Sequence, residues 1–102
     1  MHAPAGLRAL EGERFELALC GHTHGGQIAL PDGRPLHAAP GPLSRRYNRG
    51  RHSLGPGGTL IVSVGLGCTT FPIRINSDPE IVICRLSPTS DLHAGEARAS
   101  PW

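Results

Sequence analysis

Lysine is absent from this 102-residue chain, and charged residues, cysteines and aromatic residues are few. Charged residues make up 18% of the sequence and the formal net charge is only +2, too small to indicate a nucleic acid or an acidic membrane as a partner. No apolar run approaches the roughly 20 residues of a membrane-spanning helix, and no secretory signal pattern is visible. We therefore expect no membrane span, no nucleic-acid partner and a cytoplasmic location.

Cysteine is too sparse for a disulfide framework. Cys20, Cys68 and Cys84 are odd in number and lack C-x-x-C spacing, which favours small buried thiols in a reducing compartment. Fourteen glycines and ten prolines interrupt every long stretch, which excludes a helical bundle or a coiled coil. Aromatic residues contribute only 4%, and the length allows a single domain.

The hydrophobic pattern predicts a β-rich α/β chain. Residues 5–14 have the spacing of a short helix, and residues 15–20 read as an interior strand with both faces buried. The remaining expected elements are a hairpin over 27–37, a long loop over 38–58, buried strands over 59–64 and 80–86, and a disordered tail over 87–102.

The strongest chemical signal is the segment 21–27, which reads GHTHGGQ directly after a predicted buried strand. Neutral imidazole is a common ligand for zinc, manganese and iron, and alternate residues of an extended segment point the same way. His22 and His24 are therefore candidate metal ligands. On the residues alone, a polar turn whose histidines only form hydrogen bonds explains the pattern equally well.

These seven residues resemble the last signature motif of the calcineurin-like metallophosphoesterases, in the bacterial branch that reads GHTHGGQ. Upstream, His2 begins an H-A-P tripeptide that is similar to the family's H-x-P motif, twenty residues before His22. Downstream, an apolar strand, a GLG turn at 65–67, a P-x-R at 72–74 and a P-E at 79–80 also match the branch. The resemblance covers residues 1 to about 86.

The resemblance implies a four-layer α-β-β-α sandwich that binds two divalent metal ions, often manganese, iron or zinc, and hydrolyses phosphomonoesters or phosphodiesters. By the motif match, His2 and His22 would belong to one metal and His24 to the other. Bound metal lowers the pKa of water, which is the physical reason that neutral pH suffices for such chemistry. No catalytic residue is identified in this chain.

The family's D-x-H, GDxxD and GN-H-[DE] motifs do not precede His2. Three imidazoles without a bridging carboxylate cannot hold two divalent cations close together, because the repulsion is uncompensated. We therefore expect residues 1–86 to be the C-terminal part of such a domain, inactive alone and prone to associate through an exposed sheet face. The alternative is a non-catalytic remnant or a module that binds a single metal weakly.

Two further signals resemble functional patterns. Asp91 and His93 imitate the family's D-x-H motif, which we interpret as coincidence rather than circular permutation because no apolar strand precedes them. Cys20 extends the histidine pair to C-x-H-x-H, for which a small apolar thiol is a better interpretation than a zinc ligand.

Several arginines are the remaining candidates for functional residues. Arg74 could reach the mouth of the site or pair with Glu80 or Asp78. A basic cluster in the long loop indicates a solvated loop, with contact to phosphate or RNA as the less favoured interpretation. Its members are Arg45, Arg46, Arg49 and Arg51, with Tyr47 assigned a structural role; His37 and His52 are expected to be surface residues.

Overall fold

The computed structural model describes residues 1–37, 40–88 and 99–100, and its centre is a three-stranded mixed sheet in the order β1-β3-β2. β1 (Leu17–Cys20) runs parallel to β3 (Thr59–Val62), with Leu17 opposite Thr59. β2 (Gly50–Ser53) runs antiparallel to β3. A separate two-stranded ribbon joins β4 (Ile83–Cys84) to β5 (Ala99–Ser100). The chain is thus a small mixed α/β structure with few helices.

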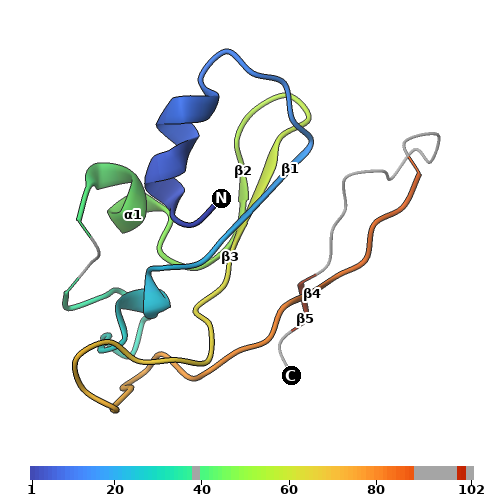
Figure 1. The fold of residues 1–102 in the computed structure, drawn as a ribbon. Coiled ribbons are helices and arrows are strands. Elements are labelled where there is room, and N and C mark those ends of the chain that lie inside the picture. Colours follow the sequence, from blue (N-terminus) through green and yellow to red (C-terminus); the bar gives the residue numbers. More distant parts are fainter. Residues whose placement is uncertain (38–39, 89–98, 101–102) are drawn as a thin grey trace.

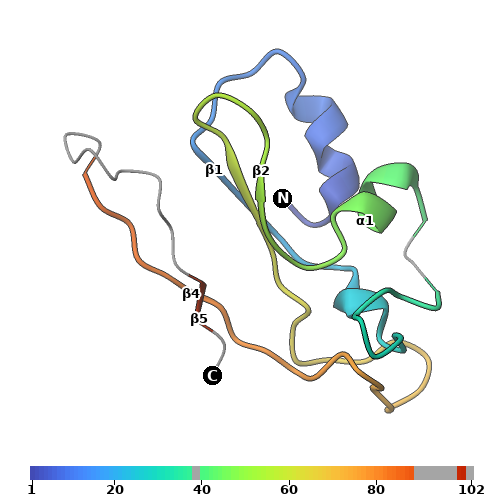
Figure 2. The ribbon, with the colours of Figure 1, turned by 180° about the vertical axis from the view of Figure 1, so that it is seen from behind.

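Two short helices lie on one side of the sheet, while the extended segment that contains β4 lies on the other (Figures 1 and 2). The helices are η1 (Pro4–Leu10), a 3-10 helix, and α1 (Pro42–Arg46). Each has proline in its first two positions, where the missing N–H has no intrahelical partner to lose. The helical segment expected over 5–14 is therefore present, although it is tighter and ends at Leu10.

The core forms between these helices and the sheet. Ala18 and Cys20 of β1 and Leu60 and Val62 of β3 are buried together, and the partly buried side chains of Leu7, Phe15, Tyr47 and Leu54 pack against them. β-branched and other apolar residues favour such a pleated, buried surface. The predicted strand over 59–64 is confirmed as β3, which ends at Val62.

The opposite face of β1 is only partly covered, so the prediction that both faces of residues 15–20 are buried is wrong. Leu19 is 49% exposed. The buried strand predicted over 80–86 is also wrong: only Ile83 and Cys84 form a strand, and Ile83 is 46% exposed. In the described part of the chain, this segment pairs with Ala99–Ser100 and not with the three-stranded sheet, so no neighbouring strand buries it.

Two other segments differ from expectation. The hairpin over 27–37 is reduced to isolated bridges, Ile28 with Ile75 and Ala29 with Pro35, around the predicted turn. The long loop expected over 38–58 instead contains α1 and β2. β2 consists of Gly, Arg, His and Ser, and its edge position leaves most of it exposed, so no alternation of apolar residues marks it as a strand. Most of the expected disordered tail lies outside the described residues.

The described chain contains no helix long and apolar enough to cross a membrane.

Replacement of Leu60 with alanine should lower the free energy of unfolding by about 2–5 kcal/mol, because its side chain is fully buried and a cavity would remain. Leu36→Ala is the matched control, since Leu36 is 63% exposed. It should change stability by less than about 0.5 kcal/mol. Urea unfolding followed by circular dichroism measures both. Equal losses would contradict the assignment of the core.

Candidate metal centre

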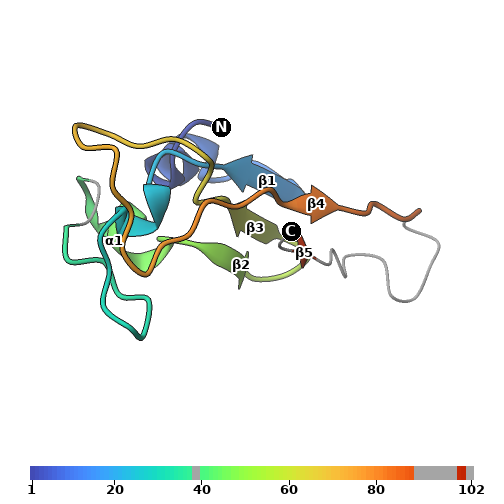
Figure 3. The same cartoon turned by 90° about the horizontal axis from the view of Figure 1, so that it is seen from below.

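The histidine turn begins where β1 ends, at the same end of the sheet as the end of β3 (Figure 3). His2 is brought beside it by a backbone hydrogen bond from the Gly21 N–H to the His2 carbonyl, at 3.0 Å. The Met1 amino group also donates to the Leu19 carbonyl, at 2.9 Å. The rings of His2 and His22 consequently lie 4.5 Å apart between centroids, tilted by 51°.

All three candidate histidines line one open cavity of about 420 Å³. His2 and His22 are adjacent, whereas His24 directs its Nδ1 toward the Gly67 carbonyl at 3.2 Å. The cavity floor is formed by the ends of the two parallel strands, including Cys20 and Ser63. The carboxyl ends of parallel strands are where open α/β sheets place their ligands.

The turn adopts a left-handed backbone at several positions, including residues that are not glycine. His22 has φ 72°, His24 φ 50° and Gln27 φ 54°. Side chains with a Cβ rarely occupy this region, and such strain persists only where surrounding contacts determine it. The two glycines are required by packing as well. A Cβ on Gly25 would collide with Ser77, and a Cβ on Gly26 would collide with Pro35.

Polar groups from two other segments, residues 48–49 and Ser77, hold the turn through its carbonyls and its threonine. Thr23 is buried, and its hydroxyl donates to the Asn48 carbonyl at 2.7 Å. The Ser77 hydroxyl donates to the His24 carbonyl at 2.7 Å, and Arg49 Nη2 donates to the Gly25 carbonyl at 2.8 Å. Since an unpaired buried carbonyl is costly, these contacts stabilise the irregular backbone.

Gln27 fixes the neighbouring loop. Its amide nitrogen donates to the carbonyls of Thr69 and Phe71, at 3.1 and 2.8 Å, and its amide oxygen accepts from the Thr69 N–H at 2.6 Å. The last residue of the GHTHGGQ segment is thus a structural clamp. Sequence reasoning did not assign it this role, because its partners are backbone groups more than forty residues away.

Arg74 contacts the histidine turn through the His24 carbonyl. It makes no ion pair with Glu80 or Asp78 in the part of the chain that the structure describes, so that interpretation is wrong. Its guanidinium donates instead to backbone carbonyls of Val64, Gly67 and Ser77. Glu80 accepts a hydrogen bond from the Val64 N–H at 3.3 Å.

The imidazoles around the cavity form only part of the ligand set that one metal ion needs. Within residues 1–37, 40–88 and 99–100, no three His, Cys, Asp or Glu side chains are arranged to hold a metal ion. The chemistry of the adjacent His2 and His22 imidazoles suits a transition metal, but two neutral ligands do not compensate the charge of two cations. The described residues therefore do not hold a two-metal centre by themselves.

Cys20 does not extend the ligand set. Its side chain belongs to the buried core, and burial raises the pKa of the thiol, an effect that the nearby N-terminal amino group opposes. A protonated thiol is a poor ligand, since the thiolate binds metals. This supports the interpretation of Cys20 as a small apolar side chain. Asp91 and His93 lie outside the described residues.

The arginines of the basic cluster lie in different environments in the structure. Arg49 supports the histidine turn, while Arg46 is exposed and stacks over the Tyr47 ring at 5.4 Å. Tyr47 packs on the core, in agreement with its expected structural role. His52 is half-buried, contacts the Tyr47 ring and bonds to the Arg49 carbonyl at 2.8 Å, so its assignment as a surface residue is wrong. His37 is exposed as expected.

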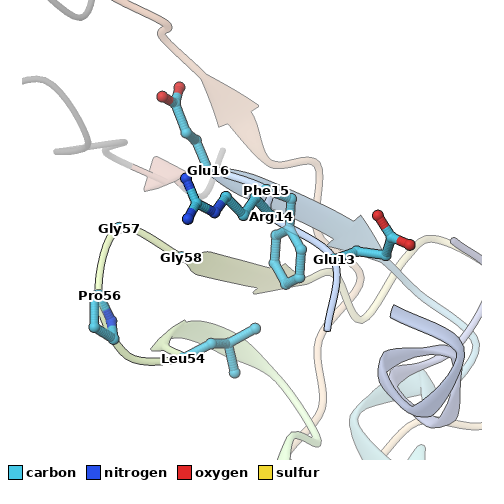
Figure 4. A pocket seen from close by; sticks show the side chains of 8 residues that line it. All are labelled: Glu13, Arg14, Phe15, Glu16, Leu54, Pro56, Gly57 and Gly58. Atoms are coloured by element: carbon cyan, nitrogen blue, oxygen red, sulfur yellow. The ribbon is translucent and has the colours of Figure 1, made fainter. Parts of the chain in front are cut away.

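A larger open cavity, of about 850 Å³, lies at the other end of β1. Figure 4 shows Phe15 directed into the space between the start of β1 and the turn that joins β2 to β3. Glu13, Arg14 and Glu16 surround the opening, and Leu54 and Pro56 line the far side. None of the candidate histidines reaches this cavity.

Comparison with known proteins finds relatives named as metallophosphoesterases or phosphodiesterases. The chain is 34% identical over 90 residues to the uncharacterized metallophosphoesterase YkuE of Bacillus subtilis, an alignment that covers 88% of this chain and 30% of that protein. It is 34% identical over 86 residues to the phosphodiesterase YaeI of Escherichia coli, covering 83% of this chain and 30% of that protein. The chain belongs to the metallophosphoesterase family.

An uncharacterized metallophosphoesterase of Aquifex aeolicus is 38% identical over 68 residues, covering 67% of this chain and 24% of that protein. This metallophosphoesterase chain therefore spans about 30% or less of the length of the relatives described. No protein-family model and no solved structure matches it.

Gly26→Ala should destabilise the chain more than Gly12→Ala. Both glycines have φ near 85° (81° and 87°), so each variant carries the cost of about 1–2 kcal/mol for a left-handed residue. Only Gly26 has no room for a Cβ, which adds about 1–3 kcal/mol of overpacking. Urea unfolding measures the difference. Comparable losses in the two variants would show that the turn is not tightly packed against Pro35.

Proposed function

We propose that this chain is the C-terminal part of a metal-dependent phosphoesterase domain and supplies imidazole ligands to its metal centre. The observation that carries the proposal is the pairing of His2 and His22, twenty residues apart, at the mouth of the cavity that His24 also lines. The named relatives support the reaction class, hydrolysis of phosphomonoesters or phosphodiesters. We propose the four-layer sandwich of the family as the architecture of the whole domain.

The residues of this chain would bind and orient rather than complete the reaction. His2 and His22 would bind one ion, and His24 would face a second, with manganese, iron or zinc as candidates. Bound metal would supply an activated hydroxide and stabilise charge on the phosphate oxygens. The strained turn would keep the rings in place, since its carbonyls are held by Ser77 and Arg49. Carboxylate ligands would have to come from residues other than those described around the cavity.

The exposed apolar surface supports a role within a larger assembly. Leu19 of β1 and Ile81 and Ile83 of the segment around β4 expose their side chains. Buried in a complete domain, these residues would contribute to its core. Because all three cysteines are free, a reducing, cytoplasmic location remains our proposal.

The second candidate function is a non-catalytic module that binds one metal ion weakly. The observation that favours it is the lack of a cluster of three or more ligand side chains in the described residues. The two candidates differ in the complete domain, where only the first predicts two bound ions; in the isolated chain both predict one weakly bound ion.

Titration of the 102-residue chain with zinc tests the histidine site that both candidates share. We expect one weakly bound ion, because two imidazoles form an incomplete ligand set. His22→Ala should weaken binding by at least about tenfold, on the scale at which even the supporting partners of ligands affect affinity. His37→Ala should leave it unchanged, since His37 is an exposed histidine that does not line the cavity. No zinc binding, or equal effects of the two variants, would contradict the proposed site.

Hydrolysis by the chain alone should be negligible. With manganese and a model aryl phosphate, we expect no turnover above the metal-only background, because the ligands that would neutralise two adjacent cations are missing from the described site. Steady-state assays with and without His22→Ala measure this. Turnover that is lost in the variant would show that the chain holds a complete centre.

A further inference from the structure

We propose that the fold binds ordered water at the side chains of Asn48 and Ser44, in a site sealed from solvent. The site is separate from the candidate metal centre, because other residues of the described chain line the histidine cavity. Bound water there stabilises residues 48–49, which hold the histidine turn. The inference does not depend on the proposed function.

Three polar atoms of these two side chains are buried without a protein partner. Ser44 is 1% exposed and Asn48 is 7% exposed. Among the groups that the structure describes, neither the Ser44 Oγ nor the Nδ2 and Oδ1 of Asn48 form a hydrogen bond. A buried donor or acceptor that stays unpaired costs the folded state its full desolvation penalty, so nearly all such groups in native proteins have a partner.

The chemistry of Asn48 selects water as that partner. Its amide presents two N–H donors and one carbonyl acceptor, so the partner must both accept and donate. A metal cation would satisfy only the oxygen and an anion only the nitrogen, whereas water satisfies both. Exchanging the assignment of nitrogen and oxygen changes nothing, because both atoms lack a protein partner in the described chain. The Ser44 hydroxyl is likewise both a donor and an acceptor.

Burial excludes a protein segment from outside as the partner. The three atoms are already covered by residues of this chain, so another chain could not contact them unless the fold opened. Water is small enough to enter during local fluctuations. Proteins contain about one buried water for every 27 residues, and each makes about three hydrogen bonds to groups that otherwise lack partners. Asn48 and Ser44 offer groups of this kind.

The main chain beside this site holds the histidine turn. The Asn48 carbonyl accepts a hydrogen bond from the buried Thr23 hydroxyl at 2.7 Å. The next residue, Arg49, donates from Nη2 to the Gly25 carbonyl at 2.8 Å. Water bound to the Asn48 side chain therefore restrains the same residue whose carbonyl restrains the turn.

Nuclear Overhauser spectra recorded at the water frequency test the site in the wild-type chain. Water held inside a protein stays long enough to give contacts of the same sign as those within the protein, unlike water on the surface. We expect such contacts at the side-chain amide protons of Asn48. The Gln27 amide is the control and should show none of this sign, since its nitrogen donates to the carbonyls of Thr69 and Phe71.

A folded chain without these water contacts at Asn48 would overturn the inference, and this result needs no variant to fold.

Asn48→Leu shows independently whether the amide is hydrated or dry. Leucine has nearly the same shape, so at a dry site it would remove an unpaired amide and stabilise the chain. At a hydrated site it displaces ordered water whose hydrogen bonds it cannot replace. We therefore expect the equilibrium constant of unfolding, measured with urea, to rise about two- to tenfold for each hydrogen bond lost. A lower or unchanged constant would overturn the site.

Ser44→Ala is a second, milder variant. Because alanine favours a helix more than serine does, a rise in the unfolding constant would occur in spite of helix propensity. We expect a rise of about two- to tenfold, from the loss of a bonded hydroxyl. Ser53→Ala is the matched control: Ser53 is exposed, and its variant should stay within about twofold of the wild type. Equal effects of the two variants would remove Ser44 from the site.

Hydrogen exchange tests the link between the water site and the histidine turn. The Gly26 N–H donates to the Thr23 carbonyl at 2.8 Å within the turn, and the Ser63 N–H donates to the Cys20 carbonyl at 2.9 Å at the sheet. Exchange in Asn48→Leu should accelerate more at Gly26 than at Ser63, because the turn loses a local support. Equal acceleration would reflect global destabilisation alone and would overturn the link to the turn.

Discussion

The left-handed turn after β1 is the constraint on which the candidate site depends. His22, His24 and Gln27 all adopt positive φ values, a conformation that the local sequence does not favour and that packing must impose. Hydroxyl and guanidinium groups from distant segments satisfy the carbonyls of the turn, and Gln27 secures the loop beyond it. The position of the imidazoles is therefore set by the tertiary structure.

The sequence predicted the parts of this arrangement that are local. β3 was predictable from its β-branched run, and the histidine turn from seven consecutive residues that match a family motif. The roles of Arg49 and Arg74 were not predictable, because each acts through backbone carbonyls remote in sequence and no carboxylate marks the contact. β2 was missed for a related reason: a polar edge strand lacks the alternation that reveals a buried one.

The wrong prediction for residues 80–86 has a physical meaning. An apolar, β-branched run predicts a buried strand only when neighbouring strands and a covering layer are available. In the described chain no strand of the three-stranded sheet pairs with this segment, and Leu19 and Ile83 are exposed. The same incompleteness appears at the metal centre, where imidazoles are present and carboxylates are not. Both features agree with a chain that spans less than a third of its relatives.

The most direct test of the account is the proximity of His2 and His22 in solution. Nuclear Overhauser spectra of the metal-free chain report contacts between ring protons, and a centroid separation of 4.5 Å should give clear cross-peaks between these two rings. Cross-peaks between β1 and β3 provide the internal reference, since Leu19 lies opposite Ile61. If the reference contacts are present and the contacts between the rings are absent, the two histidines do not form one site and the account is contradicted.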